Sequence, residues 1–71
     1  MIKANILAGL SGLLETDVSE DTVLAEVGPW DSLAVVVTIA LLDEQVGVQV
    51  TGEQVMACVT AADVLKLAGV A

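Results

Sequence analysis

Apolar residues recur every three or four positions along the first fourteen residues, which is the spacing of one face of an amphipathic helix. The positions are Ile2, Ile6, Leu7, Leu10, Leu13 and Leu14. Gly9 and Gly12 fall inside this pattern, and each is roughly 1 kcal/mol less favourable in a helix than alanine. The pattern predicts a first helix, in which the glycines either allow another element to pack closely or leave the helix weak.

The apolar pattern breaks down between Glu15 and Pro29, where acidic residues, serine and threonine predominate. A free linker would not carry large aliphatic side chains through such a segment. We therefore predict a long ordered loop, anchored in the core by Val18, Val23, Leu24 and Val27.

A second helix is predicted to open at Asp31 or Ser32, either of which can cap it, and to end near Val46, before Gly47. Helical counting predicts a core stripe at Val36, Ile39, Leu42 and Val46. The opposite, exposed side is then predicted to carry Ala34, Val37 and Leu41.

Two further helices follow a short extended stretch at residues 48–50. Thr51 followed by Gln54 has the form of a capping box and predicts a brief third helix through about Cys58. Residues 60–63 repeat the signal and begin a fourth helix, which ends near Gly69. The chain is thus expected to be one all-α domain over residues 1–71, with four helices, a long first loop and a very short third helix.

Ten acidic residues against two basic ones give a net charge of −8, which argues against a nucleic acid or an anionic membrane surface as partner. The acids either meet a basic protein surface or simply keep a domain of 56% apolar residues in solution. The longest apolar run, Leu33 to Leu42, is about half of the roughly 20 residues that span a bilayer. No signal peptide is recognised, and a single Cys58 suits a reducing compartment, so a cytoplasmic monomer is expected.

Candidate chemistry is concentrated in Pro29-Trp30-Asp31-Ser32-Leu33, at the start of the second helix. Without any histidine, Ser32 lacks a neighbouring base and is not expected to be a catalytic nucleophile. Asp31 lies roughly 18 Å along the helix from Asp43 and Glu44, which excludes a shared metal site. Ser32 is therefore either a simple helix cap or a serine that another enzyme modifies, with a phosphodiester held at the positive end of the helix.

These residues, in this helix order, resemble the acyl and peptidyl carrier proteins, four-helix domains whose Gly-x-Asp-Ser-Leu serine bears a 4′-phosphopantetheine arm. Asp-Ser-Leu is present here, although Pro29 replaces the leading glycine. With Trp30 before it, the motif resembles the Trp-Asp-Ser-Leu sequence of a subset of stand-alone carriers, which includes relatives of D-alanyl carrier proteins. The resemblance extends over nearly the whole chain, including Leu24, residues 41–50 and residues 60–65.

The resemblance implies an acyl-carrier type of bundle in which a phosphopantetheinyl transferase, with Mg²⁺ and coenzyme A, esterifies Ser32 with the arm. Asp31 is implied to support that transfer. The carrier is then expected to be no enzyme itself. It would hold an acyl or aminoacyl group as a thioester, for a loading ligase and for downstream synthases or transferases.

The predicted partner-binding residues surround the second helix and the short third one: Leu33, Ala34, Val37, Leu41, Asp43, Glu44 and Met56. Carriers of fatty-acid synthesis have acids where this chain has Ala34 and Val37, so a dedicated, partly apolar partner is expected. Trp30 either anchors its loop in the core or flanks the arm. The alternative function is an unmodified four-helix interaction module, in which Ser32 is only a cap.

Overall fold

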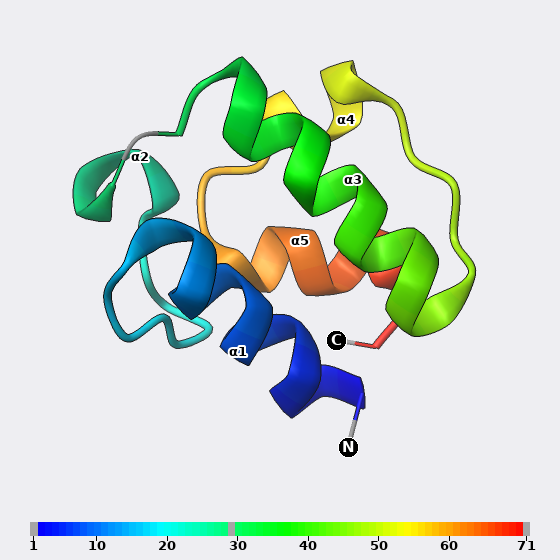
Figure 1. Ribbon diagram of the computed structural model, residues 1–71, viewed down its shortest axis with the longest axis horizontal. Helices are drawn as coiled ribbons and strands as arrows, with labels where there is room; N and C mark the ends of the chain where they lie inside the picture. Colours follow the sequence, from blue (N-terminus) through cyan, green and yellow to red (C-terminus); the bar gives the residue numbers. More distant parts are fainter. Residues whose placement is uncertain (1, 29, 71) are drawn as a thin grey trace.

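The computed structural model describes residues 2–28 and 30–70; Met1, Pro29 and Ala71 lie outside this description. Within the described residues, five helices enclose one apolar core (Figure 1). They are α1 (Ile2–Leu14), α2 (Leu24–Val27), α3 (Ser32–Val46), α4 (Gly52–Met56) and α5 (Ala61–Ala68). The expected all-α fold is confirmed, and the short α4 corresponds to the predicted third helix.

The predicted long loop contains an additional single turn of helix, α2, which the sequence pattern did not indicate. Val18 and Leu24 are buried in the core, and Val27 packs against it, so the anchoring role of these residues is confirmed. Backbone hydrogen bonds fix the loop to the turn between α4 and α5, with the Leu24 N–H donating to the Val59 carbonyl at 3.0 Å. The loop that leads into α3 is therefore held from two sides.

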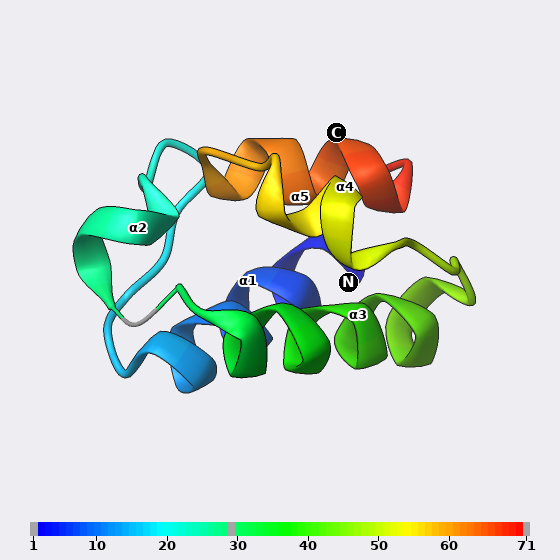
Figure 2. The ribbon, with the colours of Figure 1, turned by 90° about the horizontal axis from the view of Figure 1, so that it is seen from above.

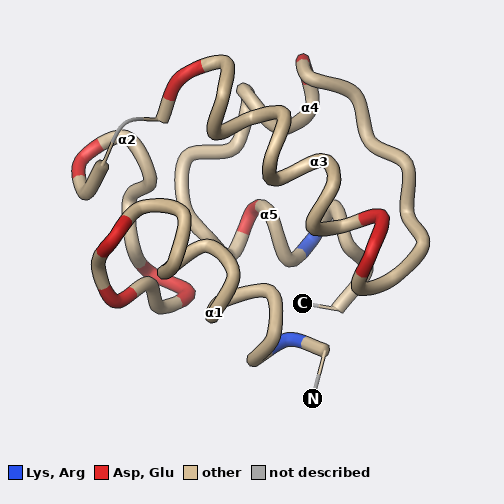
Figure 3. The backbone as a smooth tube through the Cα atoms, viewed as in Figure 1, with Lys and Arg blue, Asp and Glu red and all other residues tan. Residues whose placement is uncertain are grey.

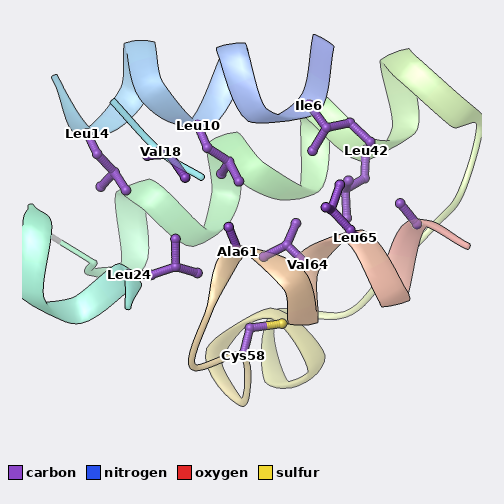
Figure 4. Packing of buried hydrophobic residues seen from close by; sticks show 11 residues of the cluster. Ile6, Leu10, Leu14, Val18, Leu24, Leu42, Cys58, Ala61, Val64 and Leu65 are labelled. Atoms are coloured by element: carbon purple, nitrogen blue, oxygen red, sulfur yellow. The ribbon is translucent and has the colours of Figure 1, made fainter. Parts of the chain in front are cut away.

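The buried side chains come from α1, α3, α4, α5, the anchored loop and the turn between α4 and α5, and most of them meet at the centre of the domain (Figure 4). Seen from above, α1 and α3 lie along one side of the domain and α4 and α5 along the other (Figure 2). The largest fully buried side chains are Ile6, Leu10, Leu24, Leu42, Leu65, Val55, Val64 and Thr38. Complete burial of a leucine or isoleucine contributes about 1.5–3 kcal/mol each, so this cluster is the main source of stability.

Gly9 allows α1 and α3 to approach closely. A Cβ atom at Gly9 would lie only 2.8 Å from both Cδ atoms of Leu41, whereas one at Gly12 would meet nothing within 4 Å. Of the two explanations for the glycines, close packing therefore holds at Gly9. The same crossing explains why Leu41 is half-buried and packs against the core, which corrects its predicted place on an exposed face.

The predicted core stripe of α3 was correct at Leu42, which is buried, and at Val46, which packs against the core, but wrong at Val36. The buried positions are Ala34, Val35, Thr38 and Leu42, whereas Val36 is 61% exposed. Ala34, predicted to be exposed, is 2% exposed. The error arises at Thr38, whose hydroxyl donates to the Ala34 carbonyl at 2.8 Å and is thereby satisfied inside the core.

The helix ends follow the predicted capping signals closely. Gly47 adopts a left-handed conformation (φ 67°) and its N–H donates to the Asp43 carbonyl at 2.9 Å, which ends α3. Thr51 and Gln54 form the predicted reciprocal capping box of α4, although this helix ends at Met56, two residues earlier than expected. Among the described residues, no helix is both long and apolar enough to cross a membrane.

Candidate functional site

The start of α3 presents a serine that the helix itself does not use. Asp31 is the N-cap: its Oδ1 accepts a hydrogen bond from the Ala34 N–H at 3.1 Å, and its carbonyl accepts one from the Val35 N–H at 3.0 Å. Ser32 is consequently the first helical residue, and its side chain is exposed. Of the two candidate caps in the sequence, Asp31 caps the helix, and the hydroxyl of Ser32 takes no part in the cap.

The chain has three serines, and their hydroxyl groups differ in what they contact. The hydroxyl of Ser11 donates to the Leu7 carbonyl at 2.8 Å and accepts from the Val18 N–H at 2.9 Å. Ser19 lies 3.2 Å, oxygen to oxygen, from the hydroxyl of Thr22. Among the described residues, Ser32 is the serine whose hydroxyl makes no hydrogen bond, so it is the one that a second protein can reach without breaking a local interaction.

The electrostatic setting of Ser32 favours an attached anion. The first N–H groups of an α-helix have no intrahelical acceptor and lie at the positive end of the helix dipole. Asp31 occupies the N–H groups of Ala34 and Val35, while those of Ser32 and Leu33 make no hydrogen bond to the described residues. A phosphodiester on Ser32 would therefore lie beside unused N–H donors at the start of a 15-residue helix.

Exposed apolar side chains follow this serine along α3 and lie on the neighbouring α4. Leu33 is 68% exposed and Val37, one turn further on, is 40% exposed. Met56 is 62% exposed and comes from α4, which packs against α3 through Gly52 and Val35. Of the apolar residues predicted to bind a partner, these three are on the surface, whereas Ala34 is buried and Leu41 is half-buried.

Acidic side chains lie at both ends of α3 and leave its middle uncharged (Figure 3). Asp31 is at the start, and the exposed Asp43 and Glu44 are near the end. Eleven residues of helix between Ser32 and Asp43 correspond to about 16 Å along the axis. The predicted acidic partner residues are therefore a helix length away from the serine.

Trp30 is half-buried and packs against the core cluster, which supports its interpretation as a loop anchor. Its ring nitrogen is buried and has no hydrogen-bond partner among the described residues. A buried indole N–H without a partner costs free energy. Apolar packing of the ring must therefore offset that cost.

Cys58 offers no competing thiol chemistry. Its side chain is 8% exposed, and its Sγ–H donates to the Gln54 carbonyl at 3.4 Å. Burial, and secondarily the nearby carboxylate of Asp63, raises the pKa of the Cys58 thiol, so the reactive thiolate is disfavoured. Among residues 2–28 and 30–70, no group of three or more histidine, cysteine or acidic side chains is arranged to hold a metal ion.

A family model described as the phosphopantetheine attachment site matches residues 4–68, nearly the whole chain. The chain belongs to this family. Comparisons with curated proteins and with solved structures gave no match. The resemblance inferred from Asp-Ser-Leu is thus confirmed at the level of the family, and the domain is an attachment site for covalent 4′-phosphopantetheine.

The start of α3 fits this prosthetic group chemically. Attachment of a phosphopantetheine requires a nucleophilic hydroxyl and leaves a phosphodiester anion, and the exposed Ser32 beside unused helix N–H groups suits both. The family therefore supports a phosphopantetheine-carrier role for the chain, and carrier domains of this kind are generally not catalysts themselves.

Proposed function

We propose that Ser32 is the residue that carries the 4′-phosphopantetheine arm, and that the protein tethers an acyl or aminoacyl group as a thioester for partner enzymes of a biosynthetic pathway. The observation that carries the proposal is that Asp31, and not Ser32, caps the start of α3. Asp31 caps the helix at 3.1 Å, so the neighbouring hydroxyl is exposed and engaged with none of the described residues.

The attachment is a phosphoryl transfer that a separate transferase performs with Mg²⁺. The Ser32 oxygen forms a bond to the phosphorus that bears the pantetheine, the pyrophosphate bond of coenzyme A breaks, and the nucleotide bisphosphate leaves. The serine proton passes to the transferase or to solvent. The protein itself contributes the position of the hydroxyl and the positive end of α3, which stabilises the new anion.

Asp31 is suited to a second role in this transfer. Its Oδ1 is used by the cap, but its Oδ2 makes no hydrogen bond to the described residues. An exposed carboxylate oxygen is a ligand that Mg²⁺ accepts. We propose that this oxygen helps the transferase place the metal beside Ser32, as the family resemblance implied.

Tethering raises the effective concentration of the cargo for each partner enzyme, which is the physical benefit of a carrier. The proposed partners are the transferase, a ligase that loads the acyl or aminoacyl group, and a downstream synthase or transferase. Trp30 before Asp-Ser-Leu favours the stand-alone carriers, whose pathways are specialised. The proposal places the protein in the cytoplasm, where both the arm's thiol and Cys58 remain reduced.

The proposed docking face consists of Leu33, Val37 and Met56, with Asp43 and Glu44 at its far end. Because the exposed side chains near Ser32 are apolar, we propose a dedicated partner with an apolar contact surface. Ala34 and Leu41 are no longer part of this face, since their side chains are buried or half-buried.

Replacing Val37 with glutamate tests the docking face. Val37 is 40% exposed, so Val37→Glu should leave the thermal unfolding midpoint within a few degrees while loading by the cognate ligase falls. Ile2→Glu is the matched control, because Ile2 is 46% exposed but lies on α1. Equal loading of both variants, or unfolding of Val37→Glu alone, would remove Val37 from the proposed face.

The carrier role itself is tested by incubating the protein with coenzyme A and a promiscuous phosphopantetheinyl transferase. Intact-mass measurement should show one phosphopantetheine adduct, and Ser32→Ala should show none. The alternative, an unmodified interaction module, predicts an unchanged mass for both proteins. A folded chain that stays unmodified under these conditions would overturn the proposal.

A further inference from the structure

A groove runs along α3 below Ser32. It has a volume of about 440 Å³ and lies between α3 and the extended segment that precedes α4. Its lining is mostly apolar, with two polar side chains at one end: Val36, Ile39, Ala40, Asp43, Gln49 and Val50.

The groove and Ser32 share one face of the helix. Residues four, seven and eleven positions after Ser32 return to the same side of an α-helix, and these are Val36, Ile39 and Asp43. The groove therefore begins one turn from Ser32, and its polar end at Asp43 lies about 16 Å from Ser32 along the helix axis.

The reach of the prosthetic group matches this distance. An extended chain advances about 3.5 Å for every three bonds, so the roughly fourteen bonds from the serine oxygen to the arm's sulfur span at most about 16 Å. An arm laid along α3 from Ser32 would thus end near Asp43 and Gln49. A shorter or coiled path would leave its sulfur over Val36 and Ile39.

The end of the groove is polar and negatively charged. Asp43 and Gln49 are both exposed, and neither side chain makes a hydrogen bond or ion pair with the described residues. A carboxylate and an amide oxygen, next to the apolar Val50, can accept hydrogen bonds from an ammonium group. Two unused acceptors at the reach of the arm favour a cargo that carries an amine.

Resting on the proposed function, we infer that, when the distal end of the arm lies in this groove, Asp43 and Gln49 favour a small aminoacyl cargo over an uncharged acyl cargo of equal size. Val36, Ile39 and Ala40 would shield the methylene groups of the arm. The docked state would hold the cargo against its own carrier between partner encounters.

Carriers loaded from propionyl-coenzyme A and glycyl-coenzyme A test the inference, because these cargoes have equal size and differ in a methyl group against an ammonium group. We compare the NMR chemical shifts of each loaded carrier with those of the carrier whose arm bears no cargo. The methyl groups of Val36, Ile39 and Val50 should change more in the glycyl carrier. Asp43→Asn should lower these shifts about two- to five-fold for the glycyl cargo only, the range expected for one solvent-exposed ion pair.

Filling the groove provides a second, independent variant. Ala40→Met should abolish the cargo-dependent shifts at Val36 and Ile39, whereas Ala8→Met, at an exposed position of α1, should leave them unchanged. Each sample is first checked by intact mass. If Ser32 carries the adduct but the groove methyl groups do not change, or change equally with both cargoes, the inference is overturned while the proposed function stands. No adduct at all overturns the proposed function instead.

Discussion

Replacing Asp31 separates the two roles that the structure gives to this side chain. Asp31→Ala removes the cap acceptor, so the Ala34 N–H loses its 3.1 Å hydrogen bond at the start of α3. Loss of an Asp cap costs about 1 kcal/mol, and loss of the negative charge beside the helix dipole adds about 0.3–1 kcal/mol. We therefore expect Asp31→Ala to lower the free energy of unfolding by about 1–2 kcal/mol in total.

Asp31→Asn keeps the cap, because asparagine caps helices as well as aspartate does. It should cost only the charge contribution, about 0.3–1 kcal/mol. Ser32→Ala should cost less than about 0.5 kcal/mol, since the Ser32 hydroxyl is exposed and makes no hydrogen bond among the described residues. Urea unfolding followed by circular dichroism gives all three values, and for a domain of this size 1 kcal/mol corresponds to about 4–8 °C in Tm.

The same three variants should rank differently as substrates of the transferase. Ser32→Ala should accept no phosphopantetheine, Asp31→Asn should be modified slowly despite its near-native stability, and Asp31→Ala should be slow as well. Modification of Asp31→Asn at the native rate would refute the proposed role of its free oxygen. A loss of 1 kcal/mol or more in Ser32→Ala would show that the serine, not Asp31, holds the helix start.

Three further predictions concern the packing and the titration of the domain. Gly12→Ala should raise the free energy of unfolding by up to about 1 kcal/mol. Gly9→Ala should give a value about 1–2 kcal/mol lower than Gly12→Ala, because its methyl group meets the side chain of Leu41. Urea unfolding measures both. Hydrogen bonds from two backbone N–H groups lower the pKa of Asp63, so its contribution to stability is present above the unfolded-state pKa and is lost as the pH falls through the folded-state pKa. Asp63→Asn should therefore make the free energy of unfolding depend less on pH below about pH 4. An unchanged pH dependence in this range would contradict the prediction. Because burial raises the pKa of Cys58, the folded apo protein should react slowly with a thiol reagent, and attachment of the arm should add one rapidly reacting thiol; fast labelling of the apo protein would contradict the buried position.

The ends of the helices were predictable because short polar signals determine them. Gly47, Thr51 and Gln54 were recognised as capping residues from the sequence, and Asp31 as one of two candidates. Each has the expected hydrogen bonds or left-handed backbone. A cap depends on one turn of chain, so local sequence is sufficient to identify it.

The faces of α3 were not predictable for the opposite reason. From Leu33 to Leu42 nearly every residue is apolar, so periodicity contains little information about which side is buried. The polar Thr38 is fully buried, because the Ala34 carbonyl satisfies it. The half-buried state of Leu41 depends on a glycine thirty-two positions earlier, a tertiary contact that no local pattern reports.

The candidate site was predictable in identity but not in geometry. Asp-Ser-Leu pointed to Ser32, yet the sequence left open whether Ser32 or Asp31 caps the helix. The groove along α3 could not be inferred, because residues 49 and 50 reach α3 only through the course of the chain between α3 and α4.

The most direct test of the account is to locate the prosthetic group within the chain after modification by the transferase. Fragmentation of the modified protein should place phosphopantetheine on Ser32, with Ser11 and Ser19 unmodified as internal controls. An adduct on either of those two serines, or none on the folded protein, would contradict the claim that the free hydroxyl at the start of α3 is the attachment point.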